Sequence, residues 1–151
     1  DYLASGLFEP KPSVQTISNA MDVGHPSNFE RMKNMFHDSV DEMKAVISGF
    51  SFSDEATRAE MRRQYASNKY ILDPHGAVGA LGLAAYRKTS HDIFCGIVLE
   101  TAHPAKFIDT VEETLKLKVE LPHALAEANR KQKQSVKMES SVERLKEYLL
   151  S

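Results

Sequence analysis

Hydrophobic residues recur every three or four positions along most of this chain, which is the spacing of amphipathic α-helices. Phe29, Met32 and Phe36 mark one such stripe. This pattern, together with helix-capping residues at the ends of the stripes, defines the expected helices. They cover residues 28–37, 40–48, 54–67, 74–88, 104–115, 122–132 and 142–149, after a short N-terminal helix that ends at a glycine, Gly6.

Three segments have the pattern of β-strands instead. Residues 93–99 form a continuous apolar run, residues 13–19 alternate apolar and polar side chains, and residues 70–72 are a very short candidate. The predicted fold class is therefore α/β, rich in helix and with few short strands. So few strands cannot make a self-sufficient parallel sheet. Either the chain is mostly helical, or its sheet partners lie in a longer polypeptide. A first residue that is Asp1 rather than methionine favours the second interpretation, with residues 1–151 as a single, incomplete domain.

The end of the apolar run 93–99 is the most informative position. Ligands of open α/β sheets bind just beyond the carboxyl ends of the strands. Thr101 lies there and offers a hydroxyl group, and Pro104 suits the first turn of the helix that follows. Thr101 is therefore predicted to contact a ligand, and the alternative is a residue that merely ends a strand.

A second candidate site is the start of the predicted helix 74–88. Asp73 is placed to cap this helix and Pro74 occupies its first position, with His75 in the same turn. Exposed N–H groups at such a terminus can bind an anion or a ligand carboxylate. Three glycines at intervals of three residues, the first being Gly76, allow close backbone approach, although they do not have the Rossmann spacing. The alternative is a well-capped helix packed tightly on a strand.

A third candidate site precedes the predicted helix 28–37. Ser27 or Asn28 can cap this helix, and Glu30 lies at capping-box spacing from Ser27. A phosphate group can dock at the same terminus. The alternative is a plain capped helix after a turn.

Composition and charge argue against several classes of function. A net charge of -2 gives no electrostatic reason to expect nucleic acid or an anionic membrane as a partner. The single cysteine, Cys95, lies in the apolar run and is predicted to be a small buried residue. No zinc-binding spacing of cysteines or histidines occurs, so no metal site is expected. No Gly-x-Ser-x-Gly motif occurs either, which argues against a serine hydrolase. A lack of any signal peptide or long apolar stretch favours a cytoplasmic location.

Taken together, three of these segments resemble the threonine synthase family. Their order and spacing agree with that family over most of the chain, and the agreement weakens after about residue 122. Gly76 is a departure, because many members have threonine or serine at this position. The resemblance lies in residues 13–24 with 26–31, in Asp73-Pro74-His75, and in the run Thr101-Ala102-His103-Pro104-Ala105-Lys106-Phe107.

The resemblance implies a pyridoxal-phosphate enzyme of the tryptophan-synthase-β fold type, with this chain as its C-terminal third or so. Such enzymes convert O-phospho-L-homoserine and water to L-threonine and phosphate. By resemblance, Thr101 faces the pyridine nitrogen of the cofactor. Asp73 and His75 border the same cleft and are expected to position substrate or to shape the pocket. Ser27 and Asn28 are expected to meet the substrate phosphate or only to order their loop. The Schiff-base lysine and the glycine-rich phosphate loop are expected upstream, so no catalytic residue is assigned here. The isolated chain is expected to be inactive and to need the missing N-terminal part as its partner.

Two alternatives stay open. One is another lyase of the same cofactor fold. The run 101–107 argues against a threonine dehydratase or a cysteine synthase, but a threonine-synthase-like phospholyase would share this segment if the residues that select the substrate lie upstream. A non-catalytic helical interaction module is the other alternative. A complete module predicts a closed core, whereas part of a larger enzyme predicts a long exposed apolar face with unpaired strand edges.

Overall fold

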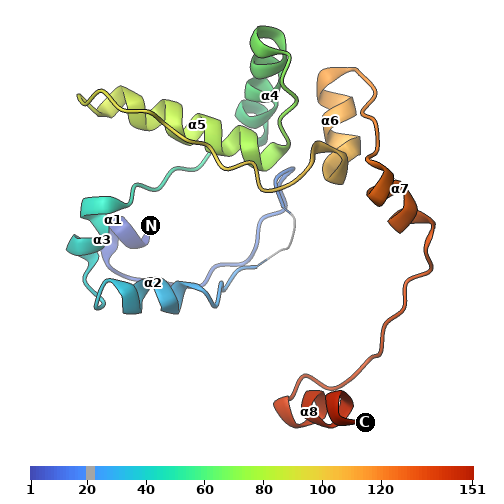
Figure 1. Ribbon diagram of the computed structural model, residues 1–151. Helices are drawn as coiled ribbons and strands as arrows, with labels where there is room; N and C mark the ends of the chain where they lie inside the picture. Colours follow the sequence, from blue (N-terminus) through green and yellow to red (C-terminus); the bar gives the residue numbers. More distant parts are fainter. Residues whose placement is uncertain (20–22) are drawn as a thin grey trace. The chain divides into compact units, whose positions relative to one another are not determined.

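The computed structural model describes residues 1–19 and 23–151 of the chain. Every regular element in these two ranges is a helix (Figure 1). The chain divides into two compact units, residues 1–120 and 121–151, and each is described by itself. None of the described helices is long and apolar enough to cross a membrane. The elements are α1 (Tyr2–Ser5), α2 (Phe29–Met35), α3 (Val40–Val46), α4 (Asp54–Asn68), α5 (Pro74–Thr89), the 3-10 helix η1 (Pro104–Phe107), α6 (Ile108–Leu115), α7 (His123–Arg130) and α8 (Val142–Leu150).

Helices α4 and α5 begin where their capping residues predict. Ser53 accepts a hydrogen bond from the N–H of Ala56 at 3.2 Å and so starts α4. Asp73 does the same for the N–H of Gly76 at 2.7 Å, and Pro74 follows it as the first residue of α5. Both caps satisfy N–H groups that have no partner inside the helix. The sequence prediction for these two helices is confirmed.

The core of the first unit lies where α4, α5 and α6 meet. Met61, Leu72, Ala77 and Val111 are buried there, and Phe107 packs against them from η1. An ion pair reinforces the contact between α4 and α6, because Arg58 lies 3.0 Å from Glu113. Burial of these side chains is the main favourable term that holds the three helices together.

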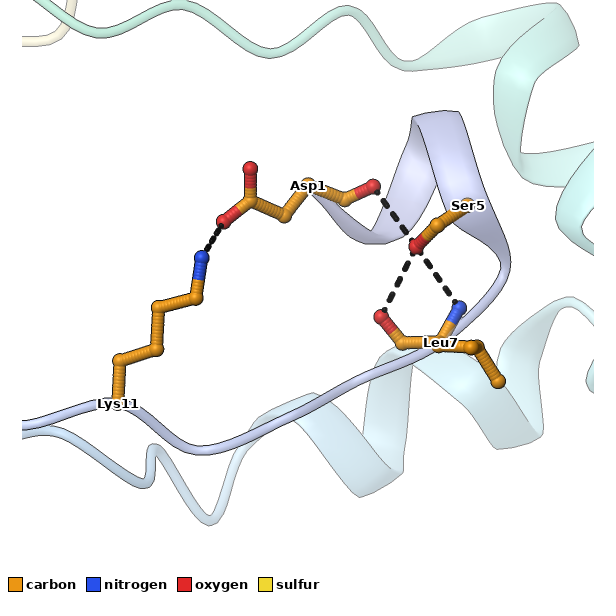
Figure 2. A network of polar contacts seen from close by, with 4 residues as sticks. All are labelled: Asp1, Ser5, Leu7 and Lys11. Carbon is orange, nitrogen blue, oxygen red and sulfur yellow. Dashed lines mark hydrogen bonds and ion pairs between the residues drawn. The ribbon is translucent and has the colours of Figure 1, made fainter.

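Aromatic contacts gather the N-terminal helices around Phe29 of α2. The Tyr2 ring meets the Phe29 ring edge-on at a centroid distance of 4.7 Å, and Phe8 lies 4.3 Å from the same ring. Gly6 ends α1 with a φ of 72°, as the sequence predicts. The Ser5 hydroxyl oxygen accepts from the N–H of Leu7 at 3.1 Å and lies 3.3 Å from the carbonyl oxygen of Asp1 (Figure 2).

The second unit contains α7 and α8. Ser141 caps α8 by accepting from the N–H of Arg144 at 3.2 Å. Leu145 and Leu149 of α8 are among its exposed large hydrophobic residues. The prediction that residues 1–151 form a single, incomplete domain stays a prediction.

The predicted strands are wrong for the described part of the chain. Residues 93–99 and 70–72 are irregular, and no backbone N–H or carbonyl group of Ile93–Leu99 hydrogen-bonds to another described backbone group. Residues 16–19 turn back on themselves through a hydrogen bond from the N–H of Asn19 to the carbonyl of Thr16 at 3.2 Å. A strand needs a neighbouring strand, and none lies within the described residues. Residues 20–22 of the first family motif lie outside the described residues.

Residues 94–100 nevertheless keep the alternation of a strand as they run along α5 (Figure 1). The Phe94 ring lies 5.5 Å from that of Tyr86, and the Leu83 side chain fills the space over Gly96. Val98 lies over Gly79. Successive even-numbered residues therefore contact positions nearer to the start of α5, so the segment runs antiparallel to the helix.

The odd-numbered residues of this segment point away from α5. Ile93, Ile97 and Leu99 have relative exposures of 106%, 81% and 78%. Cys95 is also exposed, so the prediction of a buried cysteine is wrong. That prediction assumed a strand covered on both faces, but among the described residues only the face toward α5 is covered. Residues 93–99 thus form an exposed apolar segment with the alternation of a strand, and its backbone groups are unpaired among the described residues.

Candidate functional site

The start of α5 carries a fully buried carboxylate with defined partners. One Asp73 oxygen accepts from the Gly76 N–H, and the other lies 3.2 Å from Nδ1 of His75. Donation from Nδ1 to this carboxylate leaves Nε2 of the neutral ring as an acceptor. The His75 ring lies 4.8 Å from that of Phe107, which ties it to η1. Asp73 therefore both caps α5 and orients His75.

Glu100 brings a second carboxyl group to this helix start. Its Oε1 accepts a hydrogen bond from the N–H of Asp73 at 3.2 Å, and its Oε2 is buried without a partner among the described residues. Burial raises the pKa of Glu100, and the neighbouring Asp73 carboxyl group adds to that rise. Gly76 makes room for this group, because a Cβ there would overlap the Glu100 carboxyl group. The end of the segment 94–100 is thus fixed to the first turn of α5.

Thr101 follows Glu100 directly. Its side chain is exposed, and its hydroxyl group forms no hydrogen bond to any other described residue. The hydroxyl group is consequently available to a ligand. Two residues further on, Nδ1 of His103 accepts from the N–H of Ala105 at 3.1 Å and caps η1. His103 thus has a structural role that holds the chain just after Thr101.

Within the described residues, no hydrogen bond or ion pair joins Ser27 or Asn28 to Asp73, His75 or Thr101. Both side chains are exposed. The predicted cap is wrong, because Asn28 precedes α2 with helical backbone angles and neither side chain caps the helix. An N-cap side chain needs an extended backbone to reach back to the helix N–H groups, and φ and ψ of −71° and −13° do not provide it.

The structure therefore gathers Asp73 and His75 next to the residue that precedes Thr101. We call Asp73, His75, Glu100 and Thr101 the α5 cluster. Sequence reasoning found three of its members and missed Glu100. The available signal was a single carboxylate at the end of an apolar run, one position before the candidate ligand-binding hydroxyl. Such a group is expected either to face solvent or to meet a polar partner, and here it meets Asp73.

Comparison with known proteins relates this chain to one family. Residues 77–149 match a family model described as "Threonine synthase, C-terminal". Threonine synthase from Haemophilus influenzae is 37% identical over 149 residues, covering 99% of this chain and 34% of that protein. Threonine synthase from Escherichia coli is 35% identical over 126 residues, covering 83% of this chain and 28% of that protein.

Solved structures give the same result. A crystal structure of threonine synthase from Escherichia coli matches with a TM-score of 0.75 and 32% identity, covering 99% of this chain and 34% of that one. A PLP-bound threonine synthase from Brucella melitensis matches with a TM-score of 0.65 and 26% identity, covering 98% and 36%.

The chain is homologous to threonine synthases, and it spans about a third of the length of the relatives that it matches.

Proposed function

We propose that this chain forms part of a threonine synthase and supplies Thr101 to its pyridoxal phosphate. The complete enzyme would convert O-phospho-L-homoserine and water to L-threonine and phosphate. The observation that carries the proposal is the exposed Thr101 hydroxyl group, unpartnered among the described residues, at the end of a segment pinned to α5. One similar structure is titled a PLP-bound threonine synthase, which supports the choice of cofactor.

The chemistry of Thr101 suits the pyridine nitrogen of that cofactor. A neutral hydroxyl group donates a hydrogen bond to an unprotonated ring nitrogen, whereas a carboxylate would favour the protonated ring. When bound, pyridoxal phosphate supplies an electron sink for carbanion chemistry. Thr101 would hold one end of the ring and leave it uncharged. We assign the covalent anchor and the phosphate-binding loop to the part of the enzyme that this chain does not match.

We propose that His75, Ser27 and Asn28 meet the substrate, and that the buried Asp73 shapes the pocket by orienting His75. Asp73 keeps His75 in the tautomer whose Nε2 accepts a proton or a hydrogen bond. Ser27 and Asn28 are exposed polar groups in the described loop before α2, and we assign them to the substrate phosphate. Of these residues, Asp73 and His75 have the stronger support, because their geometry is fixed by the helix start.

The exposed face of residues 93–99 supports a role within a larger enzyme. A complete interaction module would cover its apolar residues, but Ile93, Ile97 and Leu99 are open and their backbone groups are unpaired among the described residues. An apolar strand of the remaining two thirds of the enzyme would cover both. The alternative of a non-catalytic module is correspondingly less favoured.

Complementation tests the proposal. The 151-residue chain would be mixed with the part of the Haemophilus influenzae threonine synthase that it does not match, with pyridoxal phosphate and O-phospho-L-homoserine. The expected result is threonine and phosphate from the mixture and neither from the chain alone. Thr101→Ser should retain most of this turnover, and Thr101→Asp should lose it and change the cofactor absorbance.

The matched control is the same relative split at the equivalent place. If the split relative regains activity and the mixture with this chain does not, the proposal is wrong. Phosphate release without threonine would instead favour the phospholyase alternative.

A further inference from the structure

The carboxyl groups of Asp73 and Glu100 both lie at the start of α5, and few positively charged side chains pair with them. Both Asp73 oxygens are occupied, one by the Gly76 N–H and the other by His75. Glu100 Oε1 accepts from the Asp73 N–H, and Oε2 is buried with no partner in the described chain. No described lysine or arginine pairs with either group. A buried carboxylate in such a place is costly unless it is neutralised.

We propose that Glu100 is a neutral carboxylic acid in the folded chain, and that it shares one proton with the Asp73 carboxylate. Its hydroxyl group donates to Asp73, while its carbonyl oxygen keeps the bond from the Asp73 N–H. The pair then fastens the residue before Thr101 to the first turn of α5. Glu100 is in this sense a positioning residue for Thr101, a consequence that rests on the proposed function.

The residues around Glu100 accommodate its carboxyl group at the start of α5. Gly76 leaves space for its carboxyl group at this turn, since a Cβ would lie 2.6 Å from the Glu100 Cδ. The rest of the segment touches α5 through side-chain contacts, without backbone hydrogen bonds among the described residues. The Asp73–Glu100 contact is therefore the polar tie between this segment and the start of α5.

The shared proton makes the tie sensitive to pH. Burial raises the pKa of Glu100, and the charge and hydrogen bonding of Asp73 raise it further, against the opposing effect of the Asp73 N–H. His75 faces Asp73 from the α5 side, and the ring of His103 on the η1 side is engaged by the Ala105 N–H. Because the pKa of Glu100 is higher in the folded state than in the unfolded state, its contribution to the unfolding free energy is fully present below the ordinary glutamate pKa. That stability is lost as the pH rises through the folded value.

Carboxyl carbon NMR on the 151-residue chain tests the shared proton directly. The exposed glutamates Glu139 and Glu143 in the same sample serve as references. Glu100 should titrate at a higher pH than these two residues, because burial raises its pKa. If Glu100 titrates together with them, the proposal is wrong.

Two variants separate the shared proton from simple packing. Glu100→Gln keeps the shape of the acid and supplies an amide donor for Asp73. It should preserve the fold and remove the Glu100 contribution to the pH dependence, so that the unfolding free energy falls less with rising pH than in the unchanged chain. Glu100→Ala should lose the tie at every pH. A Glu100→Gln variant that keeps the original pH dependence would overturn the proposal.

None of these readouts depends on the cofactor or on threonine formation. Failure of the complementation experiment with a normal Glu100 titration would therefore reject the proposed function alone. An ordinary Glu100 titration in a chain that complements well would reject the shared proton alone.

Discussion

Replacing each of three glycines of α5 by alanine gives a graded prediction, because the three positions meet different neighbours. A Cβ at Gly82 would lie 3.7 Å from Phe50 Cδ2, which is an ordinary contact. At Gly79 it would lie 3.0 Å from Val98 Cγ1, and at Gly76 it would enter the Glu100 carboxyl group. The series therefore tests whether residues 94–100 lie along α5 in the register described.

The magnitudes follow from two opposing terms. Alanine is favoured over glycine inside a helix by about 1 kcal/mol, so Gly82→Ala should raise the free energy of unfolding by about that amount. At Gly79 the tight approach to Val98 offsets most of this gain, and the net change should be near zero. At Gly76 overpacking costs about 1–3 kcal/mol and dominates, so Gly76→Ala should destabilise the chain.

Urea unfolding of the 151-residue chain, followed by far-ultraviolet circular dichroism, measures all three variants. The Glu100→Ala variant removes the carboxyl group that the new Cβ would overlap. In that background, Gly76→Ala should lower the free energy of unfolding by less than about 0.5 kcal/mol. Equal stabilisation by all three alanines would show that nothing lies over this face of α5. An unchanged cost of Gly76→Ala without the Glu100 carboxyl group would show that the clash is elsewhere.

Three further predictions concern the α4 region and use the same unfolding assay. Met61→Ala should cost about 2–5 kcal/mol, because Met61 is fully buried in the core; a change below about 1 kcal/mol would mean that this core is not formed. Lys69→Gly should stabilise the chain by about 0.5–1 kcal/mol, because Lys69 ends α4 with a φ of 56°, and any loss would contradict the left-handed geometry. Burial opposes ionisation of Glu60, but hydrogen bonds from Arg63 and Gln64 lower its pKa overall. The stability that ionised Glu60 contributes is present above its unfolded-state pKa and is lost as the pH falls through its folded-state pKa. Glu60→Gln should therefore lower stability at pH 7 by about 1–3 kcal/mol and less at pH 3, and an equal loss at both would be the contrary result.

Helices were predictable because their signals are local. Ser53 and Asp73 each cap the helix that follows them, and Gly6 ends α1 in the left-handed conformation, as expected. The cap expected from Ser27 and Asn28 failed because capping also depends on the backbone angles before the helix, which composition does not determine.

Strands were not predictable in the same way, because a strand is defined by its neighbour. Residues 93–99 have the apolar character of a strand and keep its alternation against α5, yet nothing in the described chain pairs with them. The prediction of a buried Cys95 failed for this reason. Glu100 was missed because its partner, Asp73, lies 27 positions earlier and the contact arises only when the segment folds back along α5.

We proposed above that the rest of a threonine synthase pairs with residues 93–99, which are irregular and have no backbone partner among the described residues. Amide hydrogen exchange at Ile93–Leu99 tests it most directly, measured for the chain alone and after addition of the complementary part of the Haemophilus influenzae enzyme. The account predicts fast exchange for the chain alone and at least tenfold slower exchange at alternate amides in the mixture, on the order of 1.4 kcal/mol or more of protection. Exchange at these amides that stays fast in a mixture shown by sedimentation to be associated would contradict it.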